Sequence, residues 1–143
     1  MKLPMERLIP DAVAMRALGR ELALAATAGD LFVLTGTLGA GKTTLVQGMA
    51  QGLGVVEWVT SPTFVLMRSY RTARGIDLVH VDAYRLQSGD RIDDLDIDPD
   101  GCITAVEWGA QVAPSLADHW IAIDINADDE TLDLRHVTIR ESS

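Results

Sequence analysis

The spacing of apolar and polar residues predicts a helix followed by a buried strand near the start of the chain. Residues 11–28 repeat apolar side chains, among them Leu18 and Leu22, at intervals that place them on one face of a helix. Gly29 is the expected C-terminal cap of this helix. Residues 31–34 form a short and continuous apolar run, which is typical of a strand buried on both faces.

A second helix and several more strands are predicted farther along the chain. Residues 42–53 have a helical pattern and follow a glycine-rich turn. The apolar segments that are bounded by turn-forming or charged residues are predicted strands, namely residues 64–67, 78–81, 103–106, 120–125 and 134–139. A strand, a helix and then many strands indicate an α/β fold, with a central, mostly parallel sheet and antiparallel additions.

Length and composition indicate the number of domains and the cellular location of the protein. The chain has 143 residues, of which 48% are apolar and 23% charged, so we expect one domain over residues 1–143 with an ordinary core. Cys102 is the single cysteine and cannot form a disulfide within the chain. The start of the chain lacks the apolar run of a signal peptide, and no uncharged stretch reaches the roughly 18 residues of a membrane span. These features predict a cytoplasmic protein that does not cross a membrane.

The charge is acidic and unevenly distributed. Lys and Arg number 12 and Asp and Glu 21, which gives a net charge of −9. Residues 1–75 carry a net +3 and residues 76–143 a net −12, with no linker between them. Such a surface does not attract phosphate backbones, so binding of nucleic acids irrespective of their sequence is disfavoured. The acidic half is interpreted as a solvated face.

Residues 36–43 match the phosphate-loop pattern G-x-x-x-x-G-K-[ST] completely, between the predicted strand and the second predicted helix. Glycines let successive backbone N–H groups of such a loop face an anion, and the helix N-terminus adds partial positive charge. Lys42 is expected to reach the β- and γ-phosphates, and the Thr43 hydroxyl to ligate Mg²⁺. The residues expected to bind the nucleotide from this loop are Thr37, Leu38, Gly39, Ala40, Gly41, Lys42, Thr43 and Thr44. A guanine nucleotide is disfavoured, because the only asparagine, Asn126, is not part of an Asn-Lys-x-Asp motif.

Two of the apolar segments end in an acidic residue that could serve the same site. Asp82 follows residues 78–81, and Glu107 follows residues 103–106. The carboxyl ends of parallel strands meet at one edge of a sheet, so a carboxylate there could hold Mg²⁺ or its bound water. A carboxylate at the end of a strand is also common as a turn former, and the sequence leaves that interpretation open.

Together these motifs resemble the TsaE family, also called YjeE, the small ATPases of bacterial tRNA threonylcarbamoyladenosine biosynthesis. The resemblance covers nearly the whole chain and is clearest over residues 30–109. It rests on four motifs in order, namely residues 38–44, residues 61–64 (Ser-Pro-Thr-Phe), residues 80–86 (His-Val-Asp-Ala-Tyr-Arg-Leu) and the pair Glu107 and Trp108. The fold that it implies is a three-layer sandwich of the P-loop NTPase type.

The resemblance also implies an activity. It implies a protein that binds ATP with Mg²⁺, hydrolyses it slowly, and acts with the proteins TsaD and TsaB on the tRNA adenosine beside the anticodon. Contact with tRNA would be indirect. Lys42, Asp82 and Glu107 would be catalytic, with Asp82 orienting the attacking water. Thr43 and Glu107 would ligate Mg²⁺, and Thr63 would lie in a switch-like loop near the γ-phosphate.

The resemblance leaves the roles of several residues open. Arg135 aligns loosely with a late arginine of the family that could approach the nucleotide. Arg85 could compensate developing charge or form a surface ion pair. Tyr84 and Trp108 could stack or could pack in the core, and the core is favoured.

Some positions depart from the family pattern. Thr37 stands where the family often has aspartate, and Met15 where a threonine is common, so no nucleotide contact is carried over to Met15. Gly109 follows the tryptophan where proline is frequent. The histidines have no spacing typical of a metal site and are interpreted as structural: His80, His119 and His136.

Other functions remain open. Residues 96–107 satisfy the calcium-loop pattern D-x-[DN]-x-[DN]-G-x₅-E, although Gly89, Gly109 and Pro114 disfavour the helices that should flank it. A small-molecule kinase could use the same phosphate loop, but the late sequence offers little length for an arginine-bearing lid. A module that binds nucleotide without hydrolysing it is the third alternative.

Overall fold

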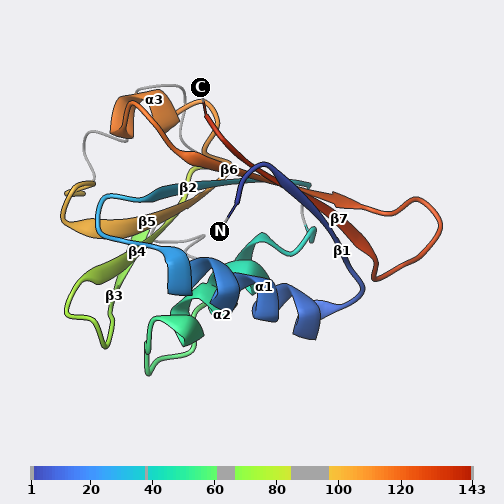
Figure 1. Cartoon of the computed structure of the whole chain (residues 1–143), viewed down its shortest axis with the longest axis horizontal. Coiled ribbons are helices and arrows are strands. Elements are labelled where there is room, and N and C mark those ends of the chain that lie inside the picture. The colour runs from blue at the N-terminus through green and yellow to red at the C-terminus, as the bar shows by residue number, and fades with distance from the viewer. Residues whose placement is uncertain (1, 38, 61–66, 85–96, 143) are drawn as a thin grey trace.

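The computed structural model describes residues 2–37, 39–60, 67–84 and 97–142 and has an α/β architecture (Figure 1). Its helices are α1 (Ala12–Ala25), α2 (Lys42–Gly52) and the short α3 (Ala113–Leu116). Its strands are β1 (Met5–Ile9), β2 (Leu31–Thr35), β3 (Met67–Arg71), β4 (Asp77–Asp82), β5 (Cys102–Glu107), β6 (Ile121–Ala127) and β7 (Arg135–Glu141). Helices lie on both faces of a central sheet, which confirms the predicted fold class.

In the described part of the chain, seven strands form one mixed sheet in the order β1-β7-β6-β2-β5-β4-β3. The central strands β6, β2, β5 and β4 are parallel. Strands β1, β7 and β3 are added by antiparallel pairing. The carboxyl ends of β2, β4 and β5 therefore lie at one edge of the sheet, which is where ligands bind in open α/β sheets.

The two faces of the sheet carry separate apolar cores. Helices α1 and α2 cover one face, where Leu18 and Leu45 pack with Phe32 of β2. The segment around α3 covers part of the other face, where Val33 of β2 packs with Val106 of β5. Strand β2 thus contributes alternate residues to both cores, as predicted for a strand buried on both faces. Among the described residues, no helix has both the length and the apolar character to cross a membrane.

Most predicted elements are present with shifted ends. Helix α1 stops at Ala25, because Ala26 adopts an extended conformation with φ −79° and ψ 148°, so Gly29 is not its cap. Of the strand predicted at residues 64–67, only Met67 lies in the described part, and it begins β3. The sequence pattern does not predict β1 or α3. The adjacent charged residues Glu6 and Arg7 interrupt the apolar alternation of β1, and α3 has only 4 residues, so neither produces a clear periodic signal.

Two glycines allow α1 and α2 to approach closely. A Cβ on Gly19 of α1 would lie 2.8 Å from the backbone nitrogen of Met49 and would overlap the carbonyl oxygen of Leu45. A Cβ on Gly48 of α2 would lie 2.7 Å from the Cα of Arg16. Because these contacts are with backbone atoms, the helices would have to separate to accept a side chain. The crossing thus fixes where α2 begins over the sheet.

We expect Gly48→Ala to destabilise the fold by roughly 1–3 kcal/mol, because overpacking outweighs the about 1 kcal/mol by which alanine exceeds glycine in helix propensity. Urea unfolding followed by circular dichroism would measure the change in the free energy of unfolding. The control is Val13→Ala on α1, where the residue is 65% exposed and the change should stay within about 0.5 kcal/mol. Equal stability of Gly48→Ala and the wild type would contradict the close crossing.

Candidate functional site

The phosphate-loop sequence connects β2 to α2. Gly39 and Gly41 adopt left-handed backbone conformations, with φ of 77° and 115°, which glycine accepts without steric cost. Gly41 is the N-cap of α2 and has no side chain to occupy the N–H groups of the first turn. These N–H groups and the positive end of the helix are therefore available to an anion. Leu38, one of the predicted contacts, lies outside the described residues.

Lys42 is the first residue of α2, and its side chain folds back over the loop. Its Nζ donates hydrogen bonds to the carbonyl oxygens of Gly36 at 2.7 Å and Thr37 at 2.9 Å. Burial lowers the pKa of Lys42, and the nearby carboxylates of Glu107 and Asp82 oppose that shift. The amine thus lies between the loop carbonyls and the two predicted acidic residues.

The two acidic residues meet at the carboxyl edge of the sheet, as predicted. Asp82 and Glu107 end β4 and β5 and are paired neighbours in the parallel ladder. Thr43 Oγ1 donates a hydrogen bond of 2.8 Å to Glu107 Oε2. Asp82 Oδ1 accepts a hydrogen bond of 2.9 Å from the backbone N–H of Tyr84, so Asp82 does support the following turn. The side chain of Glu107 instead contacts the start of α2.

His80 belongs to the same cluster, although its sequence context did not indicate this. It is fully buried, and its Nε2 lies 2.5 Å from Glu107 Oε2. Its Nδ1 has no hydrogen-bond partner among the described residues. His80 thus contacts a carboxylate of the candidate site, which the interpretation as a structural histidine does not include. Strand periodicity places residues 80 and 82 on one face of β4, but it does not indicate which residue His80 contacts.

Trp108 covers one side of this cluster. Its backbone has a φ of 60°, which is unusual for a bulky residue, and its N–H donates to the carbonyl oxygen of Leu34 at 3.0 Å. Its ring centre lies 4.1 Å from Lys42 Nζ, a cation–π contact. The ring of Tyr84 packs against it at a tilted angle, with centroids 4.9 Å apart. Tyr84 is 58% exposed, so the prediction that it packs in the core is wrong.

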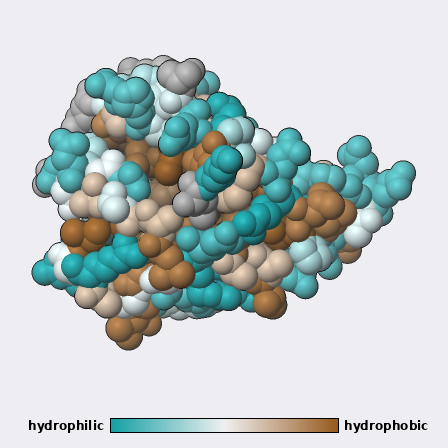
Figure 2. Space-filling model, viewed as in Figure 1, coloured by the Kyte–Doolittle hydropathy of each residue, from teal (hydrophilic) through white to brown (hydrophobic). Residues whose placement is uncertain are grey.

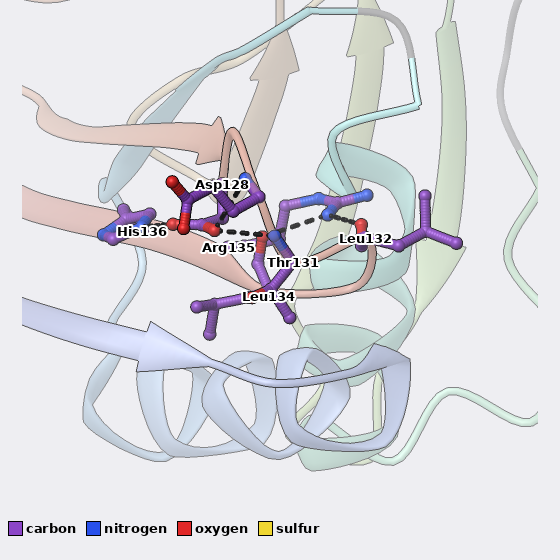
Figure 3. Close-up of polar contacts among 7 residues, drawn as sticks. Asp128, Thr131, Leu132, Leu134, Arg135 and His136 are labelled. Carbon is purple, nitrogen blue, oxygen red and sulfur yellow. Dashed lines mark hydrogen bonds and ion pairs between the residues drawn. The ribbon is translucent and has the colours of Figure 1, made fainter.

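Arg135 begins β7, directly after the hairpin that joins β6 to β7, and Figure 3 shows its side chain among the residues of that hairpin. Its Nε donates to the carbonyl oxygen of Ala40 at 3.0 Å. One Nη donates to the carbonyl oxygens of Leu132 at 2.8 Å and Leu134 at 3.1 Å. Arg135 therefore lies against the phosphate loop and contacts its backbone.

A pocket opens beside the loop. It is lined by Asp11, Ala12, Met15, Gly39, Ala40, Gly41, Thr44, Asp133 and Arg135. Thr44, a predicted nucleotide contact, thus faces a space that a ligand could enter. Met15 packs close to the loop, since a Cβ on Gly41 would lie 3.2 Å from its Cε. Asp11 and Asp133 were not predicted, because both are remote in sequence from the recognised motifs.

Other predicted residues cannot be placed, because Thr63 and Arg85 lie outside the described residues. So does Asp96, the first position of the calcium-loop pattern. The last position of that pattern, Glu107, ends the buried strand β5 rather than leading into a helix. The described part of this pattern therefore does not have the form of a helix-flanked calcium loop.

The oxygen atoms of Thr43 and Glu107 are suitable for Mg²⁺. Within the described ranges, no group of three or more His, Cys, Asp or Glu side chains is arranged to hold a metal ion. Magnesium at a phosphate loop does not need such a group, because phosphate oxygens and water complete its coordination. A hydroxyl and a carboxylate oxygen 2.8 Å apart, beside a loop that can bind an anion, fit this requirement.

Comparison with known proteins agrees with these features. Residues 9–137 match the family described as Threonylcarbamoyl adenosine biosynthesis protein TsaE. The chain belongs to the TsaE family. A relative from Streptomyces coelicolor named tRNA threonylcarbamoyladenosine biosynthesis protein TsaE is 47% identical over 131 residues, which cover 87% of this chain and 88% of the relative.

Further similar proteins support the membership of this chain in the TsaE family. A protein of the same name from Treponema pallidum is 40% identical over 102 residues, which cover 68% of this chain and 73% of the relative. The crystal structure of Bacillus subtilis YdiB is similar with a TM-score of 0.73 and 27% identity, covering 97% of this chain and 86% of YdiB. The resemblance inferred from the motifs is therefore confirmed at the level of the family.

Asp128 closes the hairpin that carries Arg135 in this TsaE protein. His136 Nε2 lies 2.7 Å from Asp128 Oδ1, and the backbone N–H groups of Glu130 and Thr131 donate to Oδ2 at 3.1 Å and 2.8 Å. The hydrogen bond with His136, followed by those two backbone N–H groups, lowers the pKa of Asp128 from 3.8 to about 2.

We expect the Asp128 carboxyl group to titrate near pH 2 in an NMR titration of side-chain carbon shifts, and His136→Asn to raise its pKa toward 3.8. Because the pKa is lower in the folded chain, the stabilisation is fully present above pH 3.8 and is lost as the pH falls toward 2. His119→Asn is the control and should leave the titration of Asp128 unchanged. An unaltered titration in His136→Asn would contradict the pairing.

Proposed function

We propose that this TsaE protein binds ATP with Mg²⁺ and hydrolyses it slowly, as part of threonylcarbamoyladenosine synthesis on tRNA. The observation that carries the proposal is the meeting of Lys42, Thr43 and Glu107 at a phosphate loop in a chain of this family. Relatives at 40–47% identity are named for tRNA threonylcarbamoyladenosine biosynthesis, which supports the same pathway here.

Each residue has a role that its position supports. The loop N–H groups and Lys42 bind the phosphates. On binding, Lys42 Nζ replaces a hydrogen bond to a loop carbonyl with one to a phosphate oxygen. Thr43 and Glu107 hold Mg²⁺, which supplies neutralising charge at the phosphates when bound. Asp82, adjacent to Glu107 at the edge of the sheet, orients the attacking water. Thr37, Gly39, Ala40, Gly41 and Thr44 complete the nucleotide contacts of the described loop.

The proposed partners are the proteins TsaD and TsaB, which we place between this chain and the tRNA. A net charge of −9 gives the chain no general attraction for an RNA backbone, so indirect action on tRNA is the simpler arrangement. The proposed location is the cytoplasm, where the tRNA substrate is found.

The decisive experiment measures phosphate release from Mg·ATP with and without a purified TsaD–TsaB pair. We expect slow release by the chain alone and a changed rate when the pair is added. Rapid phosphate transfer to a metabolite, without hydrolysis in either condition, would instead identify a kinase. Tight ATP binding with no turnover under any condition would identify a nucleotide sensor.

We expect Lys42→Ala to weaken ATP binding at least tenfold, because it removes the cation that the proposed function assigns to the phosphates. Lys2→Ala, at the only other lysine, is the matched control and should bind ATP like the wild type. Titration calorimetry with Mg·ATP would measure both.

We expect Asp82→Ala and Glu107→Ala to retain ATP binding and to lose roughly 100-fold in hydrolysis, as expected for residues that act on water and metal. Asp77→Ala, at the opposite end of β4, is the control for a lost carboxylate on this strand. Unchanged turnover in Asp82→Ala would remove Asp82 from the catalytic residues.

A further inference from the structure

The guanidinium of Arg135 joins two parts of the chain that are far apart in sequence. On the hairpin side, it donates to the carbonyl oxygens of Leu132 and Leu134 at 2.8 Å and 3.1 Å. On the loop side, it donates to the carbonyl oxygens of Ala40 at 3.0 Å and Gly39 at 3.4 Å. These bonds engage all three guanidinium nitrogens and four of the five N–H groups that an arginine side chain carries. Arg135 is therefore committed to backbone carbonyls and has little capacity left for a ligand.

The carbonyls that Arg135 contacts lie in the part of the loop that most needs a restraint. Gly39 and Gly41 flank Ala40 and have left-handed conformations, and glycine loses more conformational freedom on ordering than any other residue. An anion-binding loop works only when its N–H groups converge, and a carbonyl fixed from outside also fixes the N–H group of the same peptide plane. A cation that bonds the carbonyls therefore orders the loop before an anion arrives.

The position of Arg135 is itself well determined. Its backbone pairs with Ala127 of β6 and with Ile9 of β1, so the strand holds the residue independently of its side chain. Asp128 closes the hairpin turn through the contacts drawn in Figure 3. The hairpin projects from the sheet, and its far end is mainly hydrophilic (Figures 1 and 2). A rigid strand end thus presents the guanidinium to the loop.

We propose that Arg135 is a positioning residue that preorganises the Gly39–Ala40 segment of the phosphate loop for binding of a polyphosphate. This inference rests on the proposed function, because it assumes that the loop binds nucleotide phosphates. It differs from the expectation that Arg135 approaches the nucleotide itself. Arg135 acts on the ligand only through the loop backbone.

The test compares Arg135→Gln with Arg140→Gln by titration calorimetry, using Mg·ADP and inorganic tripolyphosphate as separate probes. Arg140 lies on the same strand, and its Nη2 is 3.6 Å from Asp124 Oδ2 on the surface, so it controls for a lost arginine on β7. We expect Arg135→Gln to lower the affinity for both probes by the same factor, about tenfold or more. Arg140→Gln should leave both affinities unchanged.

Further measurements separate positioning from stability and from direct contact. Thermal unfolding of Arg135→Gln should match that of Arg140→Gln, and amide exchange at residues 39–41 should be faster in Arg135→Gln alone. Arg135→Lys keeps the charge but cannot bridge the hairpin and the loop, so we expect it to lower the affinity for both probes as well. Unchanged affinity in Arg135→Gln, full affinity in Arg135→Lys, or a loss confined to Mg·ADP would overturn the inference.

The result also distinguishes this inference from the proposed function. If the wild type binds neither probe, the proposed function fails. If the wild type binds both probes and Arg135→Gln binds them equally well, only the role of Arg135 fails.

Discussion

The hydrogen bond from Thr43 to Glu107 ties the first turn of α2 to the end of β5, and the geometry of the candidate site depends on it. Strand β2 lies between β5 and β6 in parallel register, so the loop that leaves β2 emerges beside the end of β5. The glycine crossing with α1 then sets how α2 returns over the sheet. Any shift of α2 would move Lys42 and Thr43 together, away from the carboxylate.

This arrangement brings polar groups together at a cost in the stability of the fold. Lys42, His80, Asp82 and Glu107 are all buried, and burying charged or polar groups is unfavourable unless they are paired. The pairing is partial, because Nδ1 of His80 has no partner in the described part of the chain. Apolar residues of similar size would fill this edge of the sheet without that cost. A buried polar cluster that lowers stability in this way is typical of a functional site.

The sequence could predict the site where local rules apply and not beyond them. The phosphate-loop spacing places Lys42 and Thr43, and the rule that parallel strands end at one edge brings Asp82 and Glu107 to them. Periodicity assigns a residue to a face of a strand but not to a partner, so the contact of His80 with Glu107 could not be predicted. The contact of Arg135 with Ala40 joins residues 95 positions apart through an antiparallel edge, for which the chain has no local signal. The edge strand β1 has no strong pattern either, because Glu6 and Arg7 interrupt its apolar alternation.

The distribution of charge constrains how the proposed ligand could bind. Asp11 and Asp133 line the pocket beside the loop, and Asp82 and Glu107 lie at the carboxyl edge of the sheet, where Glu107 contacts Thr43. Lys42 and Arg135 keep their positive charges while they donate to backbone carbonyls, but two cations only partly offset four carboxylates. Free ATP would therefore meet uncompensated carboxylates, whereas Mg·ATP brings its own positive charge to them. In the proposed function, the metal ion thus contributes to affinity as well as to hydrolysis, and the acidity of the site favours the metal complex over the bare nucleotide.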